Sequence, residues 1–206
     1  MVIGGQLAAA EVRTLGPALR AAGNRVLYIA LFDTAEEIYG QTELESATDV
    51  IVWITASGHL VPLSRPQDYS VQGDRLDILT AYAKGEVLGK TPAIPLAAVN
   101  RVLIIGSNHL VRQIQDTRRG TLRDYWDKTT QFVASVYVPM QCMLKGVCGQ
   151  CLQWQINPAT GQRTKAIFAC SWQDQPLDLI DLDNVDERLS QNRLQEHLTN
   201  LWLDYL

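Results

Sequence analysis

The four cysteines of the chain all lie in its last third. They are Cys142, Cys148, Cys151 and Cys170, with the spacing C-x5-C-x2-C-x18-C, and none occurs among the first 141 residues. Clustered cysteines in a reducing compartment indicate metal or redox chemistry rather than disulfides. A [2Fe–2S] cluster needs four thiolates, of which three commonly come from one tight loop and the fourth from a separate strand. The spacing therefore predicts a [2Fe–2S] cluster with these four cysteines as ligands.

Zinc is the alternative metal, because it also accepts four thiolates. Structural zinc sites usually present two close pairs of ligands, whereas only Cys148 and Cys151 form such a pair here. The first gap is one residue longer than in the C-x4-C-x2-C spacing of plant-type ferredoxins. Gly146 and Gly149 would let backbone N–H groups turn toward the sulfurs of a cluster. Two interpretations stay open, an electron carrier and a zinc-stabilised scaffold that serves assembly.

Hydrophobic strands alternate with helical segments before the cysteines. The sequence predicts strands near residues 2–5, 25–31, 49–55, 101–105 and 131–138, and helices near 6–22, 34–39, 74–84 and 106–115. Residues 56–72 contain Gly58, Pro62 and Pro66 and are predicted to be a loop. Such alternation is typical of a parallel sheet with helices on both faces. We therefore expect an α/β fold over residues 1–138, with a doubly wound parallel sheet of the dinucleotide-binding type.

Residues 139–206 follow a different pattern and are expected to form a small [2Fe–2S] module with a terminal helix. A hairpin is predicted from 152–155 and 165–168, with Trp154 and Trp172 excluding water around the cysteines rather than relaying electrons. An amphipathic helix is predicted from Asn184, as its N-cap, to Tyr205. The acidic run near its start consists of Asp178, Asp181, Asp183, Asp186 and Glu187. That run suits either a solvated helix start or the docking of a basic partner.

The composition excludes several classes of function. The net charge of the 206 residues is −4, so the chain lacks the basic footprint of a nucleic-acid-binding protein or of one that binds an anionic membrane. No apolar run approaches the roughly 18 residues that span a bilayer, and the first residues do not have the pattern of a signal peptide. We expect a cytoplasmic protein with neither nucleic acid nor membrane as a partner.

The order of these units resembles the electron-transfer (iron–sulfur) subunit of dihydroorotate dehydrogenase. It is equally similar to ferredoxin-NADP reductase-like small subunits and to certain hydrogenase diaphorase subunits. The matching stretches are 140–142, 148–151 and 168–170, which read MQC, CGQC and FAC. The resemblance implies that the four cysteines hold a [2Fe–2S] cluster and that a nucleotide domain of the ferredoxin-reductase type delivers hydride to FAD on a preceding β-barrel.

This resemblance also implies partners. The barrel has no counterpart before Val2, so we expect a C-terminal excerpt of a longer protein or a subunit whose FAD lies on a separate partner. A flavin normally mediates between two-electron nicotinamides and a one-electron cluster. The chain is therefore expected to pass electrons between that flavin and a partner oxidoreductase, and not to be active alone.

Gly4, Gly5, Asp33 and Gly106 are the candidate residues for binding a nucleotide. The glycines follow two predicted strands, where backbone can approach a pyrophosphate, and Asp33 could accept hydrogen bonds from ribose or cap the short helix at Thr34. The turn lacks the later glycine of the family, and Glu11 adds negative charge near the helix start. The sequence thus predicts weak or absent NAD(P)H binding. The alternative is a reductase segment that binds NAD(P)H and docks it against a flavin elsewhere.

Overall fold

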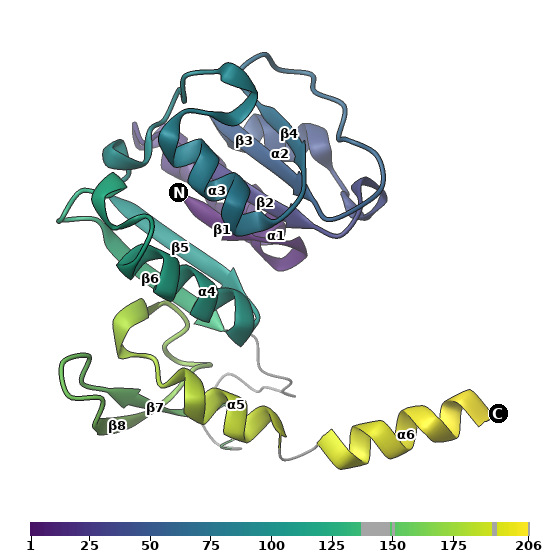
Figure 1. The fold of residues 1–206 in the computed structure, drawn as a ribbon, viewed down its shortest axis with the longest axis vertical. Helices are drawn as coiled ribbons and strands as arrows, with labels where there is room; N and C mark the ends of the chain where they lie inside the picture. Colours follow the sequence, from purple (N-terminus) through teal and green to yellow (C-terminus); the bar gives the residue numbers. More distant parts are fainter. Residues whose placement is uncertain (137–148, 150, 191–192, 206) are drawn as a thin grey trace.

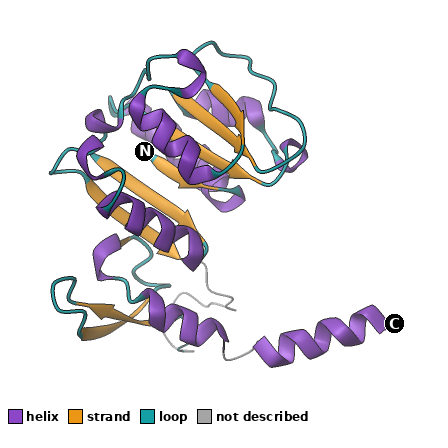
Figure 2. Ribbon diagram, viewed as in Figure 1, coloured by secondary structure: helices purple, strands orange, loops and turns teal. Residues whose placement is uncertain are grey.

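A seven-stranded sheet forms the body of the molecule in the computed structural model, which describes residues 1–136, 149, 151–190 and 193–205. The strand order is β4-β3-β2-β1-β5-β6-β9, parallel except for the edge strand β9 (Figures 1 and 2). The strands are β1 (Val2–Gly4), β2 (Leu27–Phe32), β3 (Val50–Thr55), β4 (Tyr69–Gln72), β5 (Arg101–Gly106), β6 (Gln131–Val136) and β9 (Gln175–Pro176). The order reverses at β1, which confirms the doubly wound α/β sheet.

Helices cover both faces of this sheet. α1 and α2 pack on one face, and α3 and α4 lie on the other (Figure 2). The four helices are α1 (Gln6–Ala21), α2 (Gln41–Ala47), α3 (Arg75–Lys84) and α4 (Asn108–Arg119). Short 3-10 turns occupy Ala35–Glu37, Val87–Gly89, Leu96–Ala98, Arg123–Tyr125 and Leu177–Leu179.

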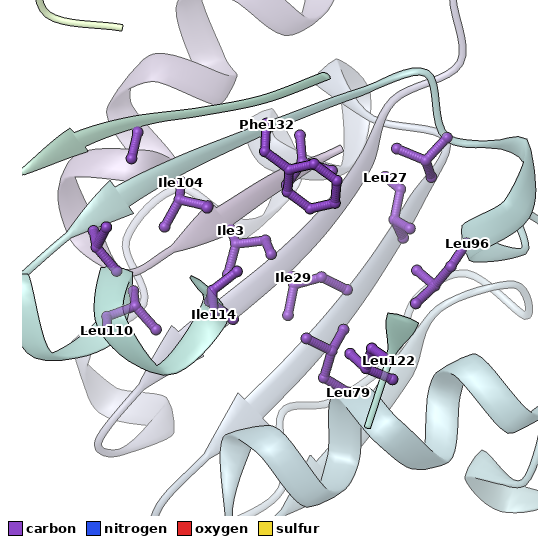
Figure 3. Packing of buried hydrophobic residues seen from close by; sticks show 14 of the residues in the cluster. Ile3, Leu27, Ile29, Leu79, Leu96, Ile104, Leu110, Ile114, Leu122 and Phe132 are labelled. Atoms are coloured by element: carbon purple, nitrogen blue, oxygen red, sulfur yellow. The ribbon is translucent and has the colours of Figure 1, made fainter. Parts of the chain in front are cut away.

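The alternation of the strands sends neighbouring residues into two separate cores. Ile3 and Ile29 pack toward α3 and α4 (Figure 3), while Val2 and Tyr28 pack toward α1 and α2. Successive side chains of a strand point to opposite faces, so strands covered on both faces are hydrophobic throughout. Burying each such large apolar side chain contributes about 1.5–3 kcal/mol. The two cores therefore explain why these strands could be predicted from the sequence.

The expectation that residues 56–72 form a loop is wrong at its end, where β4 lies. A buried carboxylate holds this segment against β3, because Asp68 Oδ1 accepts a hydrogen bond from the N–H of Ile51 at 2.9 Å. Arg65 in turn forms an ion pair with Asp68 at 2.8 Å. This polar anchor lets the following residues pair with β3, which hydrophobic patterning does not reveal. The helix α2 was likewise not predicted.

The C-terminal part begins with the predicted hairpin, formed by β7 (Leu152–Ile156) and β8 (Arg163–Phe168). The predicted terminal helix corresponds to α5 (Leu182–Ser190) and α6 (Arg193–Tyr205), and their junction at 191–192 lies outside the described residues. Asp181, not Asn184, is positioned as the cap of α5, since its Oδ1 accepts a hydrogen bond from the N–H of Asn184 at 2.9 Å. The side chain of Asn184 instead accepts the N–H of Trp154 at 3.1 Å and so ties α5 to β7.

The C-terminal part also adds to the sheet. β9 pairs with β6, and Leu177, Ile180 and Val185 join the core on the α4 side. α6, in contrast, projects away from the rest of the molecule (Figure 1). No helix in the described ranges is long and apolar enough to cross a membrane. The division into units 1–138 and 139–206 stays a prediction.

Candidate metal centre and nucleotide site

Two of the predicted metal ligands meet at the open end of the β7–β8 hairpin. Cys151 directly precedes β7, and Cys170 lies two residues beyond β8. The register pairs Leu152 with Phe168, and the N–H of Ala169 donates to the carbonyl oxygen of Cys151 at 3.1 Å. The backbone N–H of Cys170 then donates to Cys151 Sγ at 3.4 Å. Antiparallel pairing thus brings together two cysteines that are far apart in the sequence.

The other two predicted ligands, Cys142 and Cys148, lie outside the described residues, as does Gly146. Gly149 has a φ of +73°, a left-handed conformation that favours glycine, directly before the ligand segment. Its carbonyl oxygen accepts hydrogen bonds from the N–H of Leu152 at 3.1 Å and from Arg188 on α5 at 3.1 Å. Within the described ranges, no three His, Cys, Asp or Glu residues gather in a way that could hold a metal ion.

A very small apolar cluster surrounds the cysteine pair. Cys151 is fully buried, Ile167 and Ala169 are buried beside it, and Trp172 packs against them. Lys165 Nζ lies 4.7 Å from the centre of the Trp172 ring, a cation–π contact that covers this side. Trp154, by contrast, is 37% exposed on the opposite face of β7. Of these two tryptophans, Trp172 packs beside Cys151 and Cys170, whereas Trp154 does not cover this pair; its position relative to Cys142 and Cys148, which lie outside the described residues, stays a prediction.

Three buried glutamines, which the sequence reasoning missed, continue the face of β7 that carries Cys151. Gln153, Gln155 and Gln175 are each 1% exposed. Gln155 Nε2 donates to Gln175 Oε1 at 3.3 Å, and Gln175 Nε2 donates to Gln153 Oε1 at 3.1 Å. Gln153 Nε2 ends this chain as a buried donor without a partner among the described groups. Leaving such a donor unsatisfied costs about 1–3 kcal/mol, so a group that accepts its hydrogen bond is expected.

A buried, unsatisfied N–H donor two residues along the chain from a buried thiol fits an anionic metal–sulfur centre. Thiolates and sulfides accept N–H hydrogen bonds, and both the backbone N–H of Cys170 and the amide of Gln153 lie at the cysteine end of the hairpin. No local signal marks the glutamines, because Leu152, Trp154 and Ile156 alternate with them and the apolar residues of a strand are expected to be the buried ones.

An ion-pair seam joins this C-terminal part to α4. The pairs link Arg112 to Asp183 and Asp186 at 2.8 and 2.7 Å, and Arg118 and Arg119 to Asp178 at 2.7 and 2.9 Å. Arg163 of β8 pairs with Asp181 at 2.8 Å and with Glu187 at 3.2 Å. All five members of the acidic run thus pair with arginines of the same chain, a role that neither expectation for that run named.

The four candidate nucleotide residues lie along one edge of the sheet. Gly4 ends β1, Gly5 follows it, Gly106 ends β5, and Asp33 directly follows β2. All four therefore lie at the carboxyl ends of parallel strands, and the strand order reverses between β1 and its neighbours β2 and β5. Open α/β sheets bind ligands at such a switch point. Binding of a nucleotide by these residues stays a prediction.

Packing inside the chain already requires two of these glycines. A Cβ on Gly4, whose φ is +151°, would lie 2.2 Å from the carbonyl oxygen of Ile105. A Cβ on Gly5 would lie 2.8 Å from the carbonyl oxygen of Leu31. Both distances are far inside van der Waals contact, so glycine is needed for the close approach of neighbouring strands whether or not a ligand binds.

Asp33 does not cap a helix, and that expectation is wrong. Thr34 occupies the N-cap position of the 3-10 turn, without a side-chain cap hydrogen bond. Asp33 instead lines a cavity of about 380 Å³ at the carboxyl ends of β2, β3 and β4. Asp74 and Arg75, at the start of α3, line the same cavity. Arg75 was missed in the sequence because β4, which precedes it, had not been predicted.

Comparisons with known proteins show which solved structure shares this fold. No protein-family model matches the chain. An uncharacterized protein of Rickettsia prowazekii (strain Madrid E) is 35% identical over 105 residues, which are 51% of this chain and 13% of that protein. Among solved structures, the chain is similar to an NADH-dependent reduced ferredoxin-NADP oxidoreductase described for flavin-based electron bifurcation, with a TM-score of 0.64 and 18% identity. The match covers 98% of this chain and 60% of that one, so nearly the whole chain shares its fold with part of this oxidoreductase.

Proposed function

We propose that the chain is an electron-transfer module in which Cys142, Cys148, Cys151 and Cys170 hold a [2Fe–2S] cluster. The observation that carries the proposal is the meeting of Cys151 and Cys170 at the end of the hairpin, with the Cys170 N–H donating to Cys151 Sγ. The sequence supplies the remaining two thiols within nine residues of Cys151. A [2Fe–2S] cluster would supply one-electron chemistry, with its potential set by ligands, hydrogen bonds and burial.

The residues of the chain would bind the cluster and exclude water from it. Burial of Cys151 and packing of Trp172 keep solvent away from one side. The backbone N–H of Cys170 stabilises negative charge on the Cys151 sulfur. Electrons would pass between a flavin, FAD on another domain or subunit, and a partner oxidoreductase. The fold shared with a flavin-based oxidoreductase supports this assignment.

Metal and sulfide content test the proposal directly. The protein, when it is produced with ample iron and purified without air, should contain about two irons and two acid-labile sulfides per chain. Cys151→Ser and Cys170→Ser should each lose most of the cluster, because a hard oxygen replaces a soft thiolate. Ser171→Ala, next to Cys170, is the matched control and should retain it. Stoichiometric zinc without sulfide would instead support the zinc-stabilised scaffold.

Reduction by different donors tests the need for a flavin. Dithionite donates single electrons and should bleach the visible absorbance of the cluster promptly. NADH alone should not, because hydride carries two electrons and a flavin normally mediates their separation. Anaerobic spectra before and after each reductant measure this. Rapid bleaching by NADH without an added flavoprotein would contradict the proposed dependence on a partner.

A second candidate is the reductase segment that binds NAD(P)H itself. The cavity beside Asp33 favours it, since a carboxylate at the end of β2 can accept hydrogen bonds from ribose hydroxyls. Arg75 in the same cavity adds a positive charge suited to a phosphate. Calorimetric titration with NADH and NADPH separates the two candidates, because only this one requires tight binding.

A further inference from the structure

Gln153 is the one buried glutamine in the relay of Gln153, Gln155 and Gln175 whose hydrogen bonding is incomplete among the described residues. Its side-chain nitrogen is inaccessible to water and has no described acceptor, although the residue is only 1% exposed. An amide buried in this way requires an acceptor, because the interior offers no water in its place. We therefore expect this nitrogen to donate to an acceptor that the described part of the chain does not supply.

The direction of the relay indicates where that acceptor lies. Gln155 donates to Gln175 on β9, and Gln175 donates to Gln153, so Gln153 Oε1 is turned toward Gln175. Side chains two residues apart on a strand share one face, which places Cys151, Gln153 and Gln155 in order along β7. With Gln155 and Gln175 on one side of Gln153, the neighbour on the other side of this face is Cys151.

We propose that Gln153 Nε2 donates an N–H···S hydrogen bond to the metal–sulfur centre at Cys151 and so raises its reduction potential. This inference rests on the proposed function, because the acceptor is a sulfide of the cluster, since Gln153 Nε2 forms no hydrogen bond with Cys151 Sγ itself. Reduction adds one negative charge to the centre, and an N–H donor stabilises the reduced state more than the oxidised one. Gln153 is thus a positioning residue for the centre and not one of its ligands.

The relay explains why this donor is held in place. A lone glutamine can rotate its amide, but Gln175 fixes Oε1 of Gln153 at 3.1 Å and is itself fixed by Gln155. Because Gln175 lies on β9, at the edge of the main sheet, the orientation of the donor is tied to the rigid body of the molecule. Aligned amide hydrogen bonds also polarise one another, which strengthens the terminal N–H as a donor.

Matched variants of Gln153 and Gln155 separate a tuning role from a structural one. Both residues are equally buried, and each forms one hydrogen bond with Gln175. Gln153→Met should reduce the equilibrium constant for reduction of the cluster about tenfold, which corresponds to a midpoint potential lower by about 59 mV for one electron. Gln155→Met breaks the same kind of bond farther from Cys151 and should shift that equilibrium by less than threefold. Equal shifts in both variants, or none in Gln153→Met, would overturn the proposal.

A spectroscopic measurement tests the hydrogen bond itself. Chain labelled with ¹⁵N in glutamine side-chain amides and reduced with dithionite should show a ¹⁵N hyperfine coupling to the paramagnetic cluster. That coupling should persist in Gln155→Met and disappear in Gln153→Met. Should the methionine variant fail to fold, Gln153→Asn, which keeps a buried amide but shortens its reach, should also lose the coupling.

The outcomes distinguish this inference from the proposed function. Iron and sulfide are measured first in the unchanged chain, and their absence would contradict the proposed function. A cluster that is present but shows no glutamine coupling, or the same coupling after Gln153 is replaced, would overturn the N–H···S bond alone.

Discussion

The sheet and the hairpin module are held together by different means. The sheet buries large apolar side chains on both faces, in two extensive cores. Among the described residues, the separate cluster at the cysteine end of the hairpin contains only Cys151, Ile167 and Ala169 as buried members, with three partly buried neighbours. So small an apolar core cannot offset the entropy of ordering the chain, and proteins of this kind add disulfides or metals. We therefore expect the hairpin module to depend for its stability on the proposed ligands, and the sheet not to depend on them.

The module also depends on attachment to the sheet. Its ion pairs with α4 and its glutamine relay to β9 are polar, and they accompany the apolar contacts of Leu177, Ile180 and Val185 with the main core. Polar contacts contribute less per residue than apolar burial, but they fix orientation. This difference predicts that damage to the two regions will have separable consequences.

Loss of a proposed metal ligand should have the largest effect, and that effect should be confined to the module. Replacing Cys151 by Ser removes a soft ligand, and the energy of metal binding in small modules is also folding energy. We expect amide protons of β7 and β8 to lose most of their protection from hydrogen exchange, while those of β1 to β6 keep theirs. Simultaneous loss of protection in both regions would show that the chain unfolds as one cooperative unit and that the module has no separate stability.

Damage to the sheet core should have the reverse consequence. Trp53 is fully buried, with Tyr28 and Phe32 at ring-centroid distances of 6.5 and 6.4 Å. Trp53→Ala should lower the free energy of unfolding by about 3–5 kcal/mol, because it leaves a large cavity. Trp154→Ala, at a site 37% exposed, is the control and should cost less than about 1 kcal/mol. Urea denaturation measures both, and the iron content of folded Trp53→Ala should equal that of the native chain.

Elements held by apolar burial could be predicted from the sequence, whereas elements held by polar contacts could not. The buried strands are continuous apolar runs, so β2, β3 and β5 were predicted almost to their ends. β4 was missed because the carboxylate of Asp68, rather than an apolar pattern, holds it in place. The C-terminal helix was predicted to begin at Asn184 instead of Leu182, because the capping of α5 by Asp181 depends on tertiary position.

At the candidate site, residue type identified the cysteines in the sequence, but the sequence did not show which other residues lie next to them in the fold. The cysteine spacing singled out all four thiols, and the register of the hairpin brings Cys151 and Cys170 together. Gln153 and Gln175 gave no signal by type, because glutamine is ordinarily exposed. Their burial follows from the pairing of β9 with β6, a contact between distant segments that no local pattern encodes.

A moderate effect is expected where module and sheet meet. Asp178 receives hydrogen bonds from both Arg118 and Arg119, and its side chain is 34% exposed. Asp178→Asn should lower the free energy of unfolding by up to about 1 kcal/mol, the usual range for partly exposed pairs. Asp204→Asn on α6, which has no ion pair among the described residues, is the matched control and should have no measurable effect. An equal loss in 1 M salt would contradict an electrostatic origin, because salt screens exposed pairs.

This contribution should also depend on pH. Burial alone would raise the pKa of Asp178, but the hydrogen bonds and charges of Arg118 and Arg119 outweigh it and hold that pKa below its ordinary value. A carboxyl group whose pKa is lowered by folding stabilises the protein above its unfolded pKa, about 3.9, and loses this contribution as the pH falls through the folded value. The difference in stability between the native chain and Asp178→Asn should therefore be full at pH 7 and vanish on acidification. A difference that grows at low pH would contradict the assignment.

The smallest effect is expected for nucleotides, which should bind weakly or not at all. The closest approaches at Gly4 and Gly5 are already used by Ile105 and Leu31. Asn108 at the start of α4 donates to Asp186, so a carboxylate occupies the helix end where an anion would be stabilised. Titration calorimetry should detect no binding of NADH or NADPH tighter than about 1 mM, near 4 kcal/mol. Asp186→Asn removes that charge while keeping an acceptor, and Asp204→Asn is its control. Tighter binding in Asp186→Asn alone would show that the module hinders nucleotide binding at the carboxyl ends of the strands. Micromolar binding by the native chain would contradict this prediction and support the reductase segment that binds NAD(P)H itself.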